Sequence, residues 1–426
     1  MCSETMYDSD EYPRICWFVL AAGIVMMFFT MLTGLSFAPL IGVIAQDLSI
    51  DIGTASFGFM GLMMLTNAIF VLLWGVLVDK IGIFRVIIMG LSVLLIAHLL
   101  YPMIGYSYAT VVFLRILTGL GGAAGLILIE PIVSRWIPFK QRGFALGLNA
   151  LSMAGAVVGL SCVPRVVSVA GHWQVGLGWL SVPIAAGLLY TMLVAYFAQK
   201  HQTRNEAATP GEKEVGDYFG KVFLRSPAFW LGLLIMAFSN WVNNAFNDLG
   251  PGFLAVAPPI GAGYGPEVAG HLASGGMIGI VVGIFIGGIV LDKVFKGRSG
   301  ILVMAGFILC IILYNGIMLE PIYSNTTFLS MWILIGGITS PFTSIGNQYF
   351  AVRTFSPNVI GKVVACWTCI SNFVGSFGVM ISAYAIHITG SYRMSFAIMS
   401  GVCILGFIAA MASRERRTAM ELAATE

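Results

Sequence analysis

The sequence predicts an all-α membrane protein with twelve transmembrane helices in two six-helix halves. Three observations predict this fold. The 426-residue chain is 58% hydrophobic and only 10% charged, whereas roughly 25% of the residues in a soluble domain are charged. Apolar runs of about 20 residues, each long enough to cross a bilayer, recur along the chain. A loop sequence in the first half also returns in the second half.

The expected helices are the apolar runs themselves. Alternating ten-residue segments, which would indicate a membrane β-barrel, do not occur. The runs lie at about 15–38, 54–78, 84–104, 107–134, 142–164, 173–198, 227–249, 267–290, 300–319, 327–350, 362–386 and 392–412.

The chain divides at its longest charged stretch, residues 199–221. We therefore expect an N-terminal half over 1–198, a cytoplasmic linker over 199–226 and a C-terminal half over 227–426. The polar, acidic start leads directly into the first span, so no cleavable signal peptide is expected. With both termini inside, nearly all Lys and Arg residues fall on the cytoplasmic side, as the positive-inside rule requires. The expected location is the plasma membrane, or the inner membrane of a Gram-negative bacterium.

The repeated loop sequence relates the two halves. GVLVDKIGIFR at 75–85 returns as GIVLDKVFKGR at 288–298, and Asp292 follows Asp79 by 213 residues, which is half the chain length. Such a parallel repeat of two six-helix units is the arrangement found in major facilitator transporters.

The motif Gly75-x3-Asp79-Lys80-x-Gly82-x2-Arg85 resembles the loop motif of the major facilitator superfamily. Arg115-x3-Gly119 resembles the second motif of that family. The resemblance implies that Asp79, with Arg85, is a conformational latch between the halves on the cytoplasmic side. Asp292 is its partial copy. The alternative is that these residues only form turns and positive-inside flanks.

The resemblance also implies that helices 1, 4, 7 and 10 line a central cavity. Polar residues follow each of these spans at helical spacing, and in lipid their hydrogen-bonding groups would be left unpaired. The expected solute-binding residues are Thr30, Thr33, Arg115, Asn240, Asn243, Asn244, Asn247, Ser340, Thr343 and Asn347.

Three charged residues inside or near spans remain open to two interpretations. Arg115 is either a counter-charge for an anionic solute or a structural tie to Asp248 or to a cavity-helix carbonyl. Asp248 is a proton-coupling candidate or a cap at the outer end of its helix. Glu130 is a proton carrier or an interfacial residue paired with Arg135 or Arg142.

The positions of glycine and proline predict where helices break and where they pack closely. Helix 7 is expected to break at Gly250-Pro251-Gly252, and helix 1 at Pro39. Glycines recur every fourth residue in the eighth span, from Gly275 to Gly287, and on one face of the fifth. Such stripes allow close helix packing, either between the halves or within one half.

The sequence thus predicts a monomeric secondary transporter for a small polar or anionic solute, with a carboxylate favoured and with proton coupling. A proton-driven exporter of lipophilic drugs is the alternative, although Gly155-Ala156-Val157-Val158-Gly159 lacks the proline of the drug-exporter motif. Enzyme motifs are missing, so no catalytic residue, cofactor, metal or nucleic-acid partner is expected. Cys366 and Cys369 have metal-site spacing but no second ligand pair, and are expected to pack as apolar residues.

Overall fold

The computed structural model describes residues 14–138, 141–202, 226–355 and 357–413. All regular structure in these ranges is helical. The first half contains α1 (Ile15–Leu35), η1 (Ala38–Leu40), α2 (Ile41–Asp47), α3 (Ile52–Ser56), η2 (Phe57–Gly61), α4 (Leu62–Ile81), α5 (Ile83–Ile104), α6 (Tyr108–Ala123), η3 (Ala124–Ile127), α7 (Ile129–Trp136), α8 (Arg142–Leu148), η5 (Asn149–Met153), α9 (Ala154–Ala170), α10 (Trp173–Trp179) and α11 (Ser181–Gln202).

The second half repeats this plan. It contains α13 (Pro227–Ala255), α14 (Gly265–Ile289), η6 (Val290–Val294), α15 (Ser299–Gly316), α16 (Glu320–Tyr323), α17 (Thr326–Thr339), α18 (Phe342–Thr354), α19 (Pro357–Thr389) and α20 (Tyr392–Ala412). Most of the expected linker lies outside the described residues.

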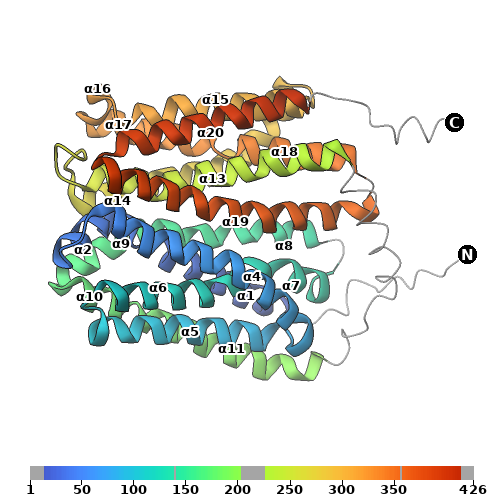
Figure 1. Cartoon of the computed structure of the whole chain (residues 1–426). Coiled ribbons are helices and arrows are strands. Elements are labelled where there is room, and N and C mark those ends of the chain that lie inside the picture. Colours follow the sequence, from blue (N-terminus) through green and yellow to red (C-terminus); the bar gives the residue numbers. More distant parts are fainter. Residues whose placement is uncertain (1–13, 139–140, 203–225, 356, 414–426) are drawn as a thin grey trace, which may run out of the picture.

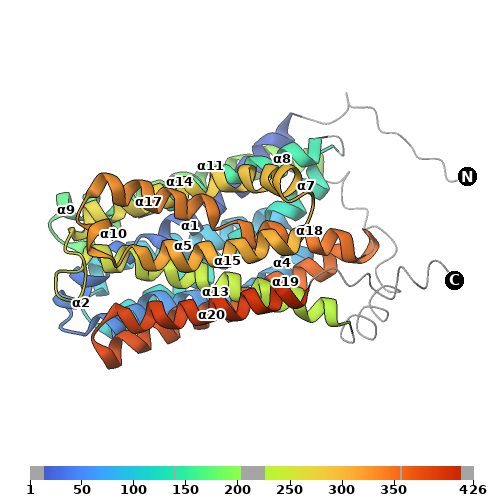
Figure 2. The same cartoon turned by 90° about the horizontal axis from the view of Figure 1, so that it is seen from above.

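The long helices run side by side along one axis of the bundle (Figures 1 and 2). Within the described residues, eleven of them are long and apolar enough to cross a membrane. The twelfth is α13, whose 29 residues include four asparagines and an aspartate. The twelve-helix prediction is therefore consistent with the structure.

The two halves pack as separate groups of helices, drawn in blue to green and in yellow to red in Figure 1. We call the end of the bundle at which α1 begins and α20 ends the termini end, and the opposite end the far end. The largest apolar core belongs to the first half, and Ala273, Met277 and Val379 of the second half join it. The halves therefore share a packed boundary at α14 and α19.

Glycines mark where the boundary is closest. A methyl group added to Gly270 of α14 would overlap the Leu160 carbonyl of α9, and one added to Gly53 of α3 would overlap the backbone of α19 at His387. Helices 5 and 8 therefore meet across the halves, as expected, but through Gly270 rather than through either predicted stripe.

The glycine stripes themselves pack within their own halves. Gly155 and Gly159 lie against the carbonyls of Phe28 and Leu32 in α1, and Gly279 and Gly283 lie against α17. Their small size permits close helix packing, but it does so inside each half. Of the two interpretations, packing within one half is the one that the structure shows.

The two expected helix breaks have different outcomes. The first span is interrupted at Pro39, where η1 separates α1 from α2. The break expected at Pro251 is wrong, because α13 continues from Pro227 to Ala255 with that proline inside it. A proline removes one hydrogen bond, and in a packed membrane bundle neighbouring helices can hold such a helix together.

Candidate functional site: a polar pocket and a contact between the halves

The asparagines of α13 divide between two neighbours. Asn240 Nδ2 donates to Ser371 Oγ at 2.8 Å and to Asn372 Oδ1 at 3.1 Å, both on α19. Asn244 packs against the same helix at Gly375. Asn243 and Asn247 instead line a pocket. The four asparagines do lie on one broad face of α13, but one part of that face contacts α19 and the other part lines the pocket.

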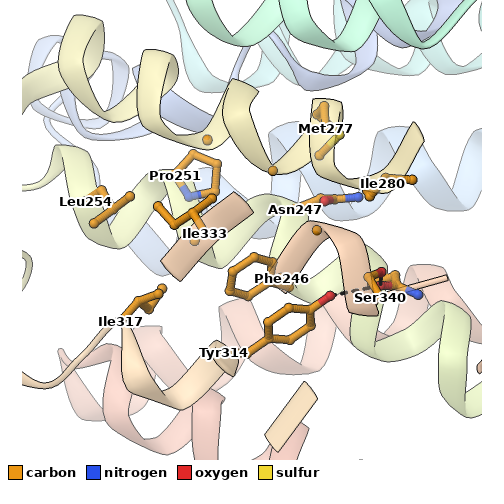
Figure 3. Close-up of a pocket in the computed structure, with 15 residues that line it drawn as sticks. Phe246, Asn247, Pro251, Leu254, Met277, Ile280, Tyr314, Ile317, Ile333 and Ser340 are labelled. Atoms are coloured by element: carbon orange, nitrogen blue, oxygen red, sulfur yellow. Dashed lines mark hydrogen bonds between the residues drawn. The ribbon is translucent and has the colours of Figure 1, made fainter. Parts of the chain in front are cut away.

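The pocket lies inside the second half, among α13, α14, α15 and α17 (Figure 3). Its walls are largely apolar and include Phe246, Pro251 and Ile333, while Asn243, Asn247 and Ser340 supply polar groups. Its volume is about 30 Å³, which is room for one or two water molecules. All the residues that line it belong to the second half, so this pocket does not have the contributions expected from helices 1 and 4.

Asn243 is held by two hydroxyl groups. Its Oδ1 accepts from Ser340 Oγ at 2.6 Å and from Tyr314 Oη at 3.2 Å. The Tyr314 ring stacks on Phe246, with ring centroids 3.7 Å apart and planes 9° from parallel. Figure 3 shows the Tyr314 hydroxyl directed toward Ser340. Sequence analysis missed Tyr314, because α15 does not belong to the four expected cavity helices.

Three of the remaining polar residues of the stripes tie helices together, whereas Thr33 bonds within its own helix. Thr343 bonds Ser239 at 2.5 Å, and Asn347 Nδ2 donates to the Gly232 carbonyl at 3.0 Å, so both join α18 to α13. Thr30 donates to the Gly122 carbonyl and Thr33 to the Phe29 carbonyl. These side chains form hydrogen bonds with other protein groups, and none of them lines the pocket.

Arg115 is completely buried. Its Nε donates to the Phe59 carbonyl at 2.6 Å, and its two terminal nitrogens donate to the Thr33 and Gly34 carbonyls at 2.9 and 3.1 Å. The guanidinium carbon also lies 4.2 Å from the centre of the Phe37 ring. Thr33 and Gly34 are in the last turn of α1, where carbonyls lack helical partners and carry partial negative charge. In this structure Arg115 is thus the structural tie to cavity-helix carbonyls, and it does not line the pocket.

Asp248 joins the two halves. This side chain is 3% exposed, and its Oδ2 accepts a short hydrogen bond from Ser56 of α3. Its other oxygen is buried without a hydrogen-bond partner. A buried carboxyl oxygen without a partner is costly when the group is ionised. Ser56 was not predicted, since one serine in an apolar run carries no periodic signal.

A second contact at the far end involves Asp51 and His387. Their side chains lie 3.0 Å apart, and Thr54 Oγ1 lies 3.3 Å from the same ring nitrogen. Asp51 also caps α3 by accepting from the Thr54 amide at 2.9 Å. Although burial raises the pKa of Asp51, the bonds from Thr54 and the neighbouring His387 lower it below its usual range. The carboxylate therefore stays ionised down to acidic pH.

The latch residues lie at the termini end. Asp79 pairs with Arg135 of the same half at 3.0 Å, and both side chains are substantially exposed. Arg135 is therefore occupied by Asp79 rather than by Glu130. Arg85, Asp292 and Glu130 are exposed. Among the described residues, no bridge from Asp79 to the second half is present.

The comparisons with known proteins identify the family. The Major Facilitator Superfamily model matches residues 20–314 and, in a second match, 246–425. The chain belongs to the Major Facilitator Superfamily. Within the superfamily, it is 22% identical to the hexuronate transporter of Bacillus subtilis, over 72% of this chain and 73% of that protein. It is also 22% identical to the probable sulfoacetate transporter SauU of Cupriavidus necator, over 80% of each.

Solved structures share the superfamily fold. A mutant of the nucleoside transporter NupG superposes with a TM-score of 0.72 at 15% identity, covering 93% of this chain and all of that one. A bacterial homologue of the lysosomal transporter Spinster, in an inward-facing and unoccupied conformation, gives 0.68, covering 94% and 96%. At this identity the likeness concerns the fold alone. In the described residues, His, Cys, Asp and Glu side chains form no group of three that could hold a metal ion.

Proposed function

We propose that this protein is a secondary transporter that carries a small organic anion across the plasma membrane by alternating access. The superfamily match supports the transport mechanism. The substrate class is supported by the hexuronate and sulfoacetate transporters, to which the chain is similar over most of its length. Both names denote organic acids that are anions at neutral pH.

The contact between the halves at the far end is the structural observation that supports transport by alternating access. There, the halves meet through Ser56 and Asp248 and through Asp51 and His387. At the termini end Asp79 is paired within its own half. We place the termini end in the cytoplasm, because most Lys and Arg residues then lie inside. The structure then represents a state closed toward the outside, and alternating access requires this contact to open.

We assign three roles to the site residues. Asn243, Asn247 and Ser340 contact the solute once the pocket of the second half, which has room for only one or two water molecules in this structure, has widened. Arg115 holds α1 in place without touching the solute. Asp248 carries the coupled proton, because its carboxyl is buried at the boundary between the halves with one oxygen unpaired, and burying an ionised group without a partner is costly. Glu130, exposed at the start of α7, is the second candidate for a proton carrier. The working unit is a monomer in the bilayer.

Uptake into liposomes reconstituted with the purified protein tests this function. We expect saturable uptake of radiolabelled glucuronate or sulfoacetate that is faster with an acidic exterior and is reduced by a protonophore. Glucose, which has the same ring without a carboxylate, is the matched control and should be carried poorly. Export of a lipophilic dye, without uptake of either anion, would contradict the proposal and favour a drug exporter.

A further inference from the structure

The second span is not a regular α-helix throughout. Between α3 and α4, η2 (Phe57–Gly61) is one π-helical turn, and the amide of Leu62 donates to the Phe57 carbonyl five residues earlier. A π turn takes up about one residue more than an α turn. Because an α-helix advances by about 100° per residue, one π turn changes the direction of the residues before it by about 100° relative to an uninterrupted helix.

This offset determines what α3 faces. Gly53 of α3 packs against the backbone of α19, and Gly61 at the end of η2 packs against Met380 of the same helix. The two glycines are eight residues apart, so in a regular α-helix they would point about 80° apart. With one residue taken up by the π turn, they point within about 20° of each other. The π turn therefore lets both glycines contact α19, and it gives Ser56 the direction in which it bonds Asp248.

A buried side chain of the same half holds the π turn. Arg115 of α6 donates from Nε to the carbonyl of Phe59, in the middle of η2, at 2.6 Å. Hydrogen bonds from a charged donor are stronger than those between neutral groups. The same guanidinium donates to the carbonyls of Thr33 and Gly34 at the end of α1. The π turn is thus anchored to two other helices of the first half.

We propose that Arg115 is a positioning residue for the contact between the halves. It holds the π turn of η2, and through that turn it keeps Gly53 against α19 and Ser56 on Asp248. Without this anchor, residues 57–61 relax toward the commoner α-helical pattern. The residues of α3 would then turn by about 100°, away from the second half. This inference rests on the proposed opening and closing of the far end, but it does not depend on which solute is carried.

Hydrogen exchange in the purified full-length protein, without any solute, tests the inference. In Arg115→Gln, amides of residues 52–61 and 381–389 should exchange at least about tenfold faster than in the wild type, at a temperature at which both proteins are folded. Gly279→Val is the matched control, because it overpacks α14 against α17 inside the second half. It should lower the melting temperature without faster exchange at the far end.

Deletion of Phe57 separates the π turn from the other bonds of Arg115. With one residue fewer, the segment can form a regular α-helix in which Gly53 and Gly61 still face α19. The deletion alone should leave exchange at the far end close to that of the wild type. Combined with Arg115→Gln, it should return this exchange to within about threefold of the wild type. The melting temperature should stay low, because the α1 carbonyls still lack their donor.

Each outcome decides the inference. Exchange at the far end that is no faster in Arg115→Gln than in Gly279→Val overturns it. Fast exchange that persists when Phe57 is also deleted assigns the effect to the α1 bonds and overturns the role of the π turn. Failure of the Phe57 deletion to fold while Arg115 is present contradicts the one-residue offset on which the inference rests. None of these results depends on a solute, so the transport proposal is decided separately by uptake.

Discussion

Ser56 and Asp248 share a hydrogen bond across the boundary between the two halves. The serine belongs to the first half and the carboxyl to the second, and both side chains are 3% exposed. Opening the far end must separate them. The protonation state of one carboxyl is thereby connected to the relative position of two six-helix units.

Asp248→Asn should uncouple transport from the proton gradient. The amide oxygen can still accept from Ser56, but the side chain no longer titrates. We expect glucuronate binding within about threefold of the wild type and retained exchange of solute across the membrane. Net uptake should no longer be stimulated by an acidic exterior. The measurement is initial uptake into liposomes as the outside pH is varied at constant inside pH.

Ser56→Ala is the matched variant for this experiment. It retains the carboxyl and removes the hydrogen-bond donor of Asp248, the only one that the described residues supply, a loss of roughly 1–3 kcal/mol for a buried group. Its uptake should remain pH-dependent. Normal stimulation by protons in Asp248→Asn would exclude Asp248 as the proton carrier and leave Glu130 to be tested in the same way.

Gly53→Val should prevent closure of the far end. The new side chain would overlap the α19 backbone at Ala383 and His387. Because the contact joins the halves, each half should still fold. We expect normal insertion, little transport and faster amide hydrogen exchange in residues 50–61. Slow exchange in these residues, with normal uptake, would contradict the closed contact.

Gly279→Val should instead lower stability. Its side chain would overlap the Leu334 carbonyl within the second half, and overpacking typically costs about 1–3 kcal/mol. The melting temperature should fall, with no selective change at the far end. Gly401→Val, where nothing lies within 4 Å, controls for both glycine experiments. A melting temperature as low in the control as in Gly279→Val would exclude overpacking as the cause.

Arg115→Gln should destabilise the protein by roughly 2–4 kcal/mol, because buried carbonyls of Thr33, Gly34 and Phe59 lose their donors. Arg115→Lys should recover only part of this, since an ammonium lacks the planar fork. Thermal unfolding in detergent measures the effect. Solute affinity of the folded protein should stay within about fivefold. Abolished anion binding with an unchanged melting temperature would restore the counter-charge interpretation.

Asp79→Asn should slow transport without affecting stability. Its pair with Arg135 is exposed, and such pairs contribute about 0–1 kcal/mol. If Asp79 is the latch that the loop motif implies, closure of the termini end needs its carboxylate, and we expect uptake to fall by about tenfold or more with binding within about threefold. Arg135→Gln should transport within about threefold of the wild type. Normal uptake by Asp79→Asn would refute the latch.

Much of the fold could be predicted from the sequence, because membrane insertion depends on local composition. Apolar length and the repeat at 79 and 292 indicated the helices and the halves. The continuity of α13 could not be predicted in this way. Glycine and proline are local signals of a break, whereas the packing that keeps Pro251 inside a helix comes from other helices.

The candidate site was predicted only in part. The spacing of Asn240, Asn243, Asn244 and Asn247 identifies one helix face, but it does not indicate which members contact α19 and which line the pocket. Ser56 and Tyr314 act through contacts distant in sequence, so no pattern marks them. Arg115 had two interpretations, and only the positions of the carbonyls around it distinguish them.

The unbroken course of α13 has a consequence for energy coupling. Asn247, on the pocket, and Asp248, on the boundary between halves, are consecutive residues of one continuous helix. A negative charge bound near the first repels an ionised second, so an anion in the pocket favours the protonated acid. By thermodynamic reciprocity, the proton strengthens anion binding by the same factor. If the proposed roles of Asn247 and Asp248 hold, the adjacency of these two residues makes the binding of solute and the binding of the proton favour each other.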